Sequence, residues 1–186
     1  MRKTVLVLGS NFGGLTAALA VKRELHGDVD VRVISPGDRF VFNPSLIWLP
    51  FGARKREDIT FKVGPTFEAA GVEFVQKAAA KIEPELNRVV DVDGVNHQYD
   101  YLVIATGTVN DWDRVPGVKE NAGTIVTLAD AEDSGRRWRE FLNDPGDIVI
   151  GATQGASCFG AAYEYLFNVS YQLRKAGIKK QVNLTY

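Results

Sequence analysis

The chain has 186 residues, 45% of them hydrophobic, and a formal net charge of −1 at pH 7. This composition supports an ordered core in one large or two small domains, and the balanced charge gives no support for nucleic-acid binding. A single cysteine excludes an internal disulfide framework and fits a reducing compartment. Two histidines, His26 and His97, are too few for zinc, so no metal is expected. We also expect no secretory signal and no transmembrane segment.

The first predicted elements are a strand, a glycine turn and a helix. Thr4–Leu8 is a short β-branched run typical of a buried parallel strand, and Leu15–Leu25 has helical apolar spacing. The turn between them, GSNFGG (9–14), carries Asn11 where the G-x-G-x-x-G pattern has its middle glycine. Asn tolerates the turn but crowds a phosphate more than glycine does. Because the helix start offers N–H groups to a pyrophosphate, the segment predicts a dinucleotide-binding unit; the alternative is a plain connecting turn.

A second strand, Val29–Ser35, completes a βαβ unit about 20 residues downstream. At the end of this strand, dinucleotide-binding folds usually carry an acidic residue that holds the ribose hydroxyls. Ser35 occupies that place, and Asp38 follows three residues later. We expect Ser35 rather than Asp38 to meet the ribose, although Ser35 serves equally well as the start of a turn.

The middle of the chain is predicted to extend this unit. Leu46–Phe51 is apolar but contains Pro50, which favours a core-covering loop or a wall beside a cofactor ring over a long helix. Further elements are expected as an extended segment at Ile59–Val63, a short helix at Thr66–Ala70, a third parallel strand at Val72–Gln76, and a buried strand at Tyr101–Ala105. A small antiparallel meander is expected from Ala78–Ile82, Arg88–Val92 and Asn96–Leu102.

The opening pattern returns in weaker form near the end. After a polar connector at Asn110–Gly123 and a helix at Asp130–Leu142, we predict a strand at Asp147–Ile150, a turn at 151–156, a helix at Ser157–Ala176 and a strand from Val182. Thr153 replaces the middle glycine of this turn, so we infer a Rossmann-like unit that does not bind NAD(P). Because this βαβ unit stops within its second strand, we expect the chain to be the N-terminal part of a longer protein.

Four segments carry a resemblance to a known family: GSNFGG (9–14), FVFNPS (40–45), YDYLVIATG (99–107) and GATQGASCFGAAYE (151–164). In this order they resemble the sulfide:quinone oxidoreductases, flavoproteins with two dinucleotide-binding domains, over nearly the whole chain. The resemblance implies an α/β Rossmann-like FAD/NAD(P)-binding fold, with a parallel sheet, helices and a small antiparallel meander. It implies an FAD-binding domain at 1–110, a connector with one helix at 111–146, and the start of a second dinucleotide-binding-like domain at 147–186.

The same resemblance implies FAD as the cofactor, held without a covalent bond or through a thioether. Its pyrophosphate would lie over residues 9–14, its ribose near Ser35, its adenine near Ala78 and Ala79, and its ring near Asn43, Pro44 and Gly107. The implied cofactor-binding residues are Gly9, Asn11, Phe12, Gly13, Gly14, Ser35, Pro44, Ser45, Ala78, Ala79, Ala105, Thr106 and Gly107.

Cys158 is the candidate catalytic residue. It lies in the predicted first turn of a helix, where N–H groups and the helix dipole lower a thiol pKa and favour the reactive thiolate. The resemblance matches it to a redox cysteine whose partner lies in a C-terminal half. Sulfide would attack their disulfide to give a persulfide, and the released thiolate would pass two electrons to FAD, which a quinone reoxidises. A buried cysteine that only packs the helix is the alternative.

Two positions depart from the family pattern. Val126 and Asp130 stand where many members have a further cysteine and a histidine, which argues against a three-cysteine mechanism and leaves a two-cysteine mechanism open. Rival interpretations are an NADH:quinone or cytochrome-linked flavoprotein dehydrogenase, and a truncated, non-catalytic flavin-fold module. The expected partners are sulfide and quinone, without nucleic acid, in the cytoplasm. The resemblance leaves open a homo-oligomer and peripheral membrane contact through later segments.

Overall fold

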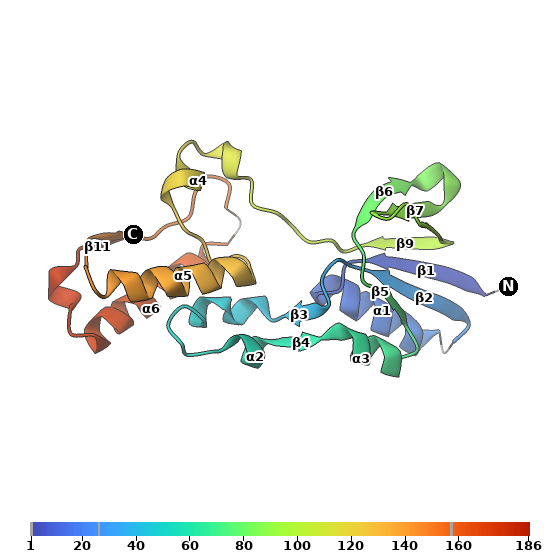
Figure 1. Cartoon of the computed structure of the whole chain (residues 1–186), viewed down its shortest axis with the longest axis horizontal. Helices are drawn as coiled ribbons and strands as arrows, with labels where there is room; N and C mark the ends of the chain where they lie inside the picture. Colours follow the sequence, from blue (N-terminus) through green and yellow to red (C-terminus); the bar gives the residue numbers. More distant parts are fainter. Residues whose placement is uncertain (1, 26, 157) are drawn as a thin grey trace. The chain divides into compact units, whose positions relative to one another are not determined.

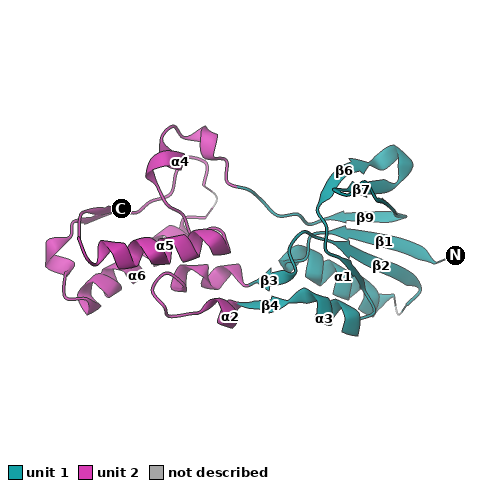
Figure 2. Cartoon of the chain, in the orientation of Figure 1, with its two compact units in different colours: residues 1–41, 60–109 teal, residues 42–59, 110–186 magenta. Residues whose placement is uncertain are grey.

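The computed structural model describes residues 2–25, 27–156 and 158–186. The chain forms two compact units, coloured separately in Figure 2: unit 1 contains residues 1–41 and 60–109, and unit 2 contains residues 42–59 and 110–186. This division differs from the expected domains. The expected boundary at 110 lies beside the division after Val109, but residues 42–59 and the expected connector at 111–146 both belong to unit 2.

Unit 1 is built on a four-stranded parallel sheet in the order β5-β2-β1-β9 (Figure 1). The strands are β1 (Lys3–Leu8), β2 (Val29–Ile34), β5 (Glu73–Val75) and β9 (Tyr101–Ile104). Each overlaps a segment that the sequence predicts as a strand. Their β-branched and aliphatic runs suit strands whose two faces are both covered.

Different elements pack against the two faces of this sheet. On one face, Val5, Val7 and Val33 pack in a cluster with residues of α1 (Phe12–Glu24) and α3 (Val63–Ala69). On the other face, a second cluster joins Leu6, Leu8 and Ile34 to Val89 of a three-stranded antiparallel sheet. That sheet contains β6 (Ala79–Glu83), β7 (Arg88–Asp91) and β8 (Asn96–Gln98), and the 3-10 helix η2 (Pro84–Leu86) connects β6 to β7. The predicted meander is therefore confirmed, but its third strand ends at Gln98 and not at Leu102, because Tyr101 and Leu102 belong to β9 of the parallel sheet.

A two-stranded antiparallel ribbon also belongs to unit 1. It pairs β3 (Arg39–Val41) with β4 (Thr60–Lys62), and Phe40 stacks on Phe61 with 4.8 Å between ring centroids. The sequence predicts an extended segment at β4 but not its pairing with β3. Between the two strands, the chain passes through unit 2 as the 3-10 helix η1 (Asn43–Trp48) and the short helix α2 (Arg56–Ile59).

Unit 2 contains two longer helices, α5 (Leu128–Phe141) and α6 (Gly160–Lys175). The strands β10 (Ile148–Val149) and β11 (Leu184–Thr185) pair in parallel, so β10, α6 and β11 form the predicted second βαβ unit. Ile150, Val169, Leu173 and Val182 form its core. The remaining short elements are η3 (Trp112–Arg114), α4 (Val118–Asn121) and η4 (Lys179–Gln181). No helix in the described part of the chain combines the length and apolarity needed to span a membrane.

Candidate functional site

The carboxyl ends of the parallel strands in unit 1 bring several predicted site residues to one edge of the sheet. Gly9 N, directly after β1, donates to Ile34 O of β2 at 2.8 Å, and Ala105 N, directly after β9, donates to Leu8 O at 2.8 Å. Ser35 N, directly after β2, donates to Val75 O of β5 at 3.2 Å. Ligands of open α/β sheets bind at this edge, so the predicted nucleotide residues of unit 1 lie where such a site forms.

The glycines at this edge permit very close backbone packing. Gly9 has φ +104°, and a β-carbon there would lie 2.2 Å from Ala105 O. A β-carbon on Gly14 would lie 1.9 Å from Gly9 O, and one on Gly13 would lie 3.3 Å from the Ala105 β-carbon. Any larger residue at positions 9 or 14 must therefore separate the turn, α1 and the end of β9.

Asn11 has a different role from the glycine that it replaces. Its backbone is extended (φ −93°, ψ −156°), a conformation open to any residue, and it is the N-cap of α1. Its side chain makes no capping hydrogen bond; instead its Oδ1 accepts from Val41 N of β3 at 3.3 Å. The ring of the adjacent Phe12 contacts Phe40 edge-on, with centroids 4.7 Å apart. The turn is therefore joined to the β3–β4 ribbon.

Ser35 is buried, with only 7% of its surface exposed. Ser10 Oγ donates to Ser35 Oγ at 2.9 Å and lies 3.2 Å from Gly37 O. These bonds join the turn after β1 to the turn after β2. They give Ser35 a structural role, and ribose binding by Ser35 stays a prediction. Ser10 was not singled out from the sequence, where only its place between Gly9 and Asn11 marked it.

The edge fits the pyrophosphate of a dinucleotide. The first turn of α1 contains no acidic residue to repel an anion, and the first N–H groups of a helix have no acceptor within the helix. Ala79 is exposed and Ala78 half-buried after β5, while Gly107, with φ +76°, follows Thr106 after β9. These residues have the positions expected of nucleotide neighbours, but their contacts with FAD stay predictions.

Three further predicted residues belong to the other unit. Asn43, Pro44 and Ser45 lie in η1, whose residues Leu46 and Ile47 are buried in unit 2. Their proximity to the flavin ring stays a prediction.

Cys158 is exposed, so the interpretation as a buried packing residue is wrong. The predicted helix start at Ser157 lies outside the described residues, and α6 begins at Gly160 with Phe159 as its N-cap. Cys158 therefore precedes the helix instead of lying in its first turn. The reason given from the sequence for a reactive thiolate, a place in that turn, is wrong. An exposed thiol before a helix remains accessible to sulfur exchange.

The second glycine turn is approached by a cation of the same unit. Gly155 has φ +83°, and a β-carbon there would lie 3.4 Å from the guanidinium carbon of Arg114. Ala156 N donates to Thr153 O at 3.1 Å and closes the turn. The inference that this unit does not bind NAD(P) stays a prediction.

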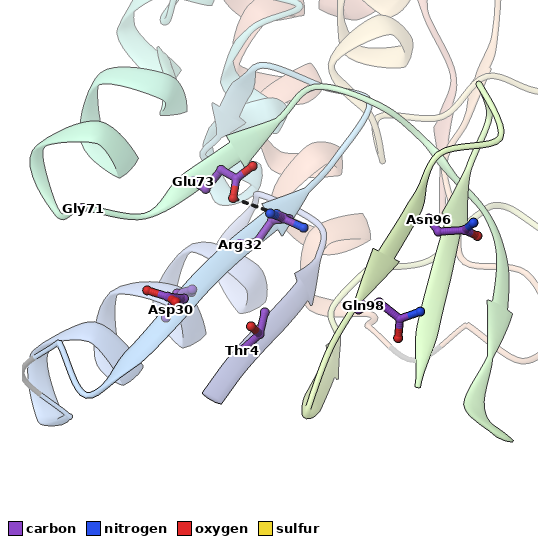
Figure 3. A pocket seen from close by; sticks show the side chains of 8 residues that line it. Thr4, Asp30, Arg32, Gly71, Glu73, Asn96 and Gln98 are labelled. Carbon is purple, nitrogen blue, oxygen red and sulfur yellow. Dashed lines mark hydrogen bonds and ion pairs between the residues drawn. The ribbon is translucent and has the colours of Figure 1, made fainter. Parts of the chain in front are cut away.

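A pocket of about 500 Å³ lies elsewhere in unit 1, on the face of the sheet near the amino ends of its strands (Figure 3). Its lining includes Thr4, Asp30, Arg32, Gly71, Glu73, Asn96 and Gln98. Arg32 Nε donates to Glu73 at 2.8 Å, so two of its charges compensate each other. Thr4 lies near the amino end of β1, whereas Gly9 directly follows its carboxyl end, so this pocket is separate from the glycine turn.

Across the described residues, no group of three or more His, Cys, Asp or Glu side chains is arranged to hold a metal ion. His26 lies outside the described residues. His97 is buried, and its Nε2 lies 3.0 Å from Asp91 Oδ2.

The sequence profile of the family described as pyridine nucleotide-disulphide oxidoreductase matches residues 3–163. The chain is 37% identical to the sulfide-quinone reductase of Aquifex aeolicus over 186 residues, which is all of this chain and 43% of that protein. It is 32% identical to the mitochondrial sulfide:quinone oxidoreductase of Dictyostelium discoideum, covering 98% of this chain and 41% of the relative. A type II NADH:quinone oxidoreductase of Staphylococcus epidermidis is 31% identical over 128 residues, 68% of this chain and 32% of that protein.

The solved structures agree. The crystal structure of the Aquifex aeolicus sulfide:quinone oxidoreductase superposes with a TM-score of 0.90 at 37% identity, over 97% of this chain and 42% of that one. These similarities confirm the resemblance and the Rossmann-like fold predicted from the sequence. The chain spans less than half of the length of these relatives.

Proposed function

This chain belongs to the pyridine nucleotide-disulphide oxidoreductase family, and from that membership we propose that it is part of an FAD-dependent enzyme that oxidises sulfide and reduces a quinone. The observation that carries the proposal is the 37% identity to a sulfide-quinone reductase over the whole chain. The carboxyl edge of the parallel sheet in unit 1 also suits a dinucleotide. The type II NADH:quinone oxidoreductase is a more distant match, which covers a smaller part of the chain.

The residues of unit 1 hold the nucleotide of FAD. Gly9, Gly13 and Gly14 allow the pyrophosphate to approach the start of α1, whose N–H groups and dipole favour an anion. Ala78 and Ala79 border the adenine, and residues 105–107 approach the cofactor after β9. Pro44 and Ser45, with Asn43, supply contacts to the ring. FAD bound by these residues would supply the two-electron redox chemistry that links sulfide oxidation to quinone reduction.

Cys158 supplies the sulfur chemistry. Hydrosulfide attacks a disulfide between Cys158 and a second cysteine, the S–S bond breaks, and one sulfur becomes a persulfide while the other leaves as a thiolate. Because the chain contains one cysteine, the partner comes from a part of the protein beyond these residues. The exposed position of Cys158 gives sulfide and the partner access to it.

The proposed enzyme is cytoplasmic and takes sulfide and a quinone as its small-molecule partners. Because quinones dissolve in membranes, the proposal includes a peripheral membrane contact through segments outside these residues. It also includes a homo-oligomer. The type II NADH:quinone oxidoreductase relative favours one rival, a dehydrogenase that takes hydride from NADH.

Anaerobic reduction of the bound flavin tests the proposal, in a full-length protein that contains this chain. We expect sulfide, but not NADH, to bleach the flavin absorbance. Cys158→Ser should abolish this bleaching while FAD stays bound, whereas Thr153→Ser, a one-methyl change in the same segment, should preserve it. Bleaching by NADH alone would favour the dehydrogenase, and full sulfide reduction in Cys158→Ser would assign the thiol no catalytic role.

A further inference from the structure

Asn11 occupies the middle glycine position of the dinucleotide motif, where a side chain is expected to crowd a phosphate. Its backbone needs none of the conformational freedom of glycine, because φ −93° and ψ −156° are ordinary extended values. The position therefore carries a side chain without backbone strain, and the question is where that side chain goes.

The carboxamide points to β3 and not to the helix that it precedes. Asn is a preferred N-cap residue because its oxygen usually accepts an N–H of the first helical turn. Asn11 makes no such bond; its Oδ1 accepts Val41 N at 3.3 Å. The first turn of α1 is therefore not capped by its own N-cap side chain, and the acceptor that would compete with a phosphate is directed away.

The pairing of β3 with β4 explains why the Val41 N–H is available to Asn11. In an antiparallel pair, alternate residues direct their N–H groups toward the partner strand. Phe42 N donates to Ile59 O at 2.8 Å and Val63 N to Asp38 O at 2.9 Å, so the register turns the N–H of Val41 outward. Both strands of a two-stranded ribbon are edge strands, which present unpaired backbone N–H and C=O groups. Asn11 Oδ1 accepts the outward N–H of Val41.

Aromatic contacts join the same two segments independently. The Phe12 ring lies edge-on to Phe40, with centroids 4.7 Å apart, and Phe40 stacks on Phe61 at 4.8 Å. Phe40 is 9% exposed, so this contact continues from the glycine turn into the core of unit 1.

We propose that Asn11 is a positioning residue for the FAD pyrophosphate: its side chain fixes the glycine turn to β3 and leaves the start of α1 to the phosphate. This inference rests on the proposed FAD function. It requires the substituted motif to bind FAD better than the glycine motif would in this fold.

FAD affinity of the full-length protein that contains this chain, measured by quenching of flavin fluorescence, tests the proposal. Asn11→Gly and Asn11→Ala should each raise the Kd by about three- to tenfold, the effect of losing one ordinary hydrogen bond that positions the turn. Asn96→Ala, an identical truncation on β8 of the same unit, should leave the Kd unchanged. An Asn11→Gly chain that binds FAD as tightly as the wild type, or more tightly, overturns the proposal.

A second measurement separates this inference from the proposed function. Hydrogen exchange of the Val41 amide in the cofactor-free chain should be slow in wild type and Asn11→Asp, which keeps an acceptor oxygen, and about three- to tenfold faster in Asn11→Gly and Asn11→Ala. If the full-length wild-type protein binds no FAD, the proposed function fails, whatever the exchange shows. Unchanged Val41 exchange in Asn11→Gly overturns the role of Asn11, even if FAD binds.

Discussion

At the scale of single residues, the carboxyl edge of the parallel sheet packs closely only because positions 9 and 14 are glycines without side chains. Gly9 and Gly14 approach each other and Ala105 so closely that a single carbon would overlap a carbonyl oxygen. Tight interiors yield poorly to added atoms, because neighbouring backbone must move to admit them. These two glycines are therefore constrained by the apo fold itself, before any cofactor is considered.

Gly14→Ala should lower the free energy of unfolding by about 1–3 kcal/mol, because its methyl group would lie 1.9 Å from Gly9 O. Gly64→Ala in α3 is the matched control: apart from its chain neighbours and the backbone of its own helix, no heavy atom lies within 4 Å of the added β-carbon, and alanine favours helix, so we expect equal or higher stability. Urea unfolding followed by circular dichroism measures both. Equal midpoints for the two variants would contradict the close approach seen at Gly14.

At the scale of elements, one carboxylate organises the β7–β8 hairpin. Asp91, 3% exposed, accepts from Asp93 N and Val95 N, each at 2.9 Å, and its second oxygen lies 3.0 Å from His97 Nε2. The hydrogen bond from His97 lowers the pKa of Asp91 most, burial opposes it, and the backbone N–H groups of Val95 and Asp93 lower it further. The ionised carboxylate is therefore the form that the fold favours.

A lowered folded-state pKa stabilises the protein above the unfolded value of about 4, and this contribution is lost as pH falls through the folded pKa. Asp91→Asn should therefore unfold at lower urea concentration than wild type at pH 7, with a difference that shrinks below about pH 4. Asp93→Asn, in the same hairpin but 53% exposed beside Lys77, should change little at either pH. A deficit in Asp91→Asn that is independent of pH would show that the charge of Asp91 is not the stabilising feature.

The elements also show which features the sequence could predict. β-branched runs locate the parallel strands within a residue or two, because their cause is local and periodic. The β3–β4 pairing was missed because two three-residue strands meet across an 18-residue excursion. α5 begins at Leu128, two residues before the predicted start, because Thr127 and Asp130 form a reciprocal cap. The Ser10–Ser35 and Asn11–Val41 bonds join distant segments, and no local pattern reports such partners.

At the scale of the whole molecule, the chain carries a sheet edge at which nucleotide binding is predicted, and one exposed thiol. Its relatives are more than twice as long, and a disulfide requires a second sulfur that these residues lack. The fold is thus established within the chain, nucleotide binding at the edge of its sheet stays a prediction, and the second cysteine of the proposed disulfide is not contained in the chain.

The isolated 186-residue chain should consequently show little sulfide-driven quinone reduction. Quinone absorbance under anaerobic conditions measures the rate, with the Aquifex aeolicus sulfide-quinone reductase as the positive control and the Cys158→Ser chain as the background. A rate close to that of the positive control, lost in Cys158→Ser, would show that one cysteine suffices.

The interleaving of the two units sets an order for their assembly during synthesis. Residues 42–59 leave the ribosome before the second half of unit 1, yet their structural partners in unit 2 begin at residue 110. Leu46 and Ile47, which finish 2% and 5% exposed, must therefore wait for η1 to meet α5 and α6. Until those helices emerge, this apolar segment is a natural target for chaperones, and slowed translation after residue 60 would prolong its exposure.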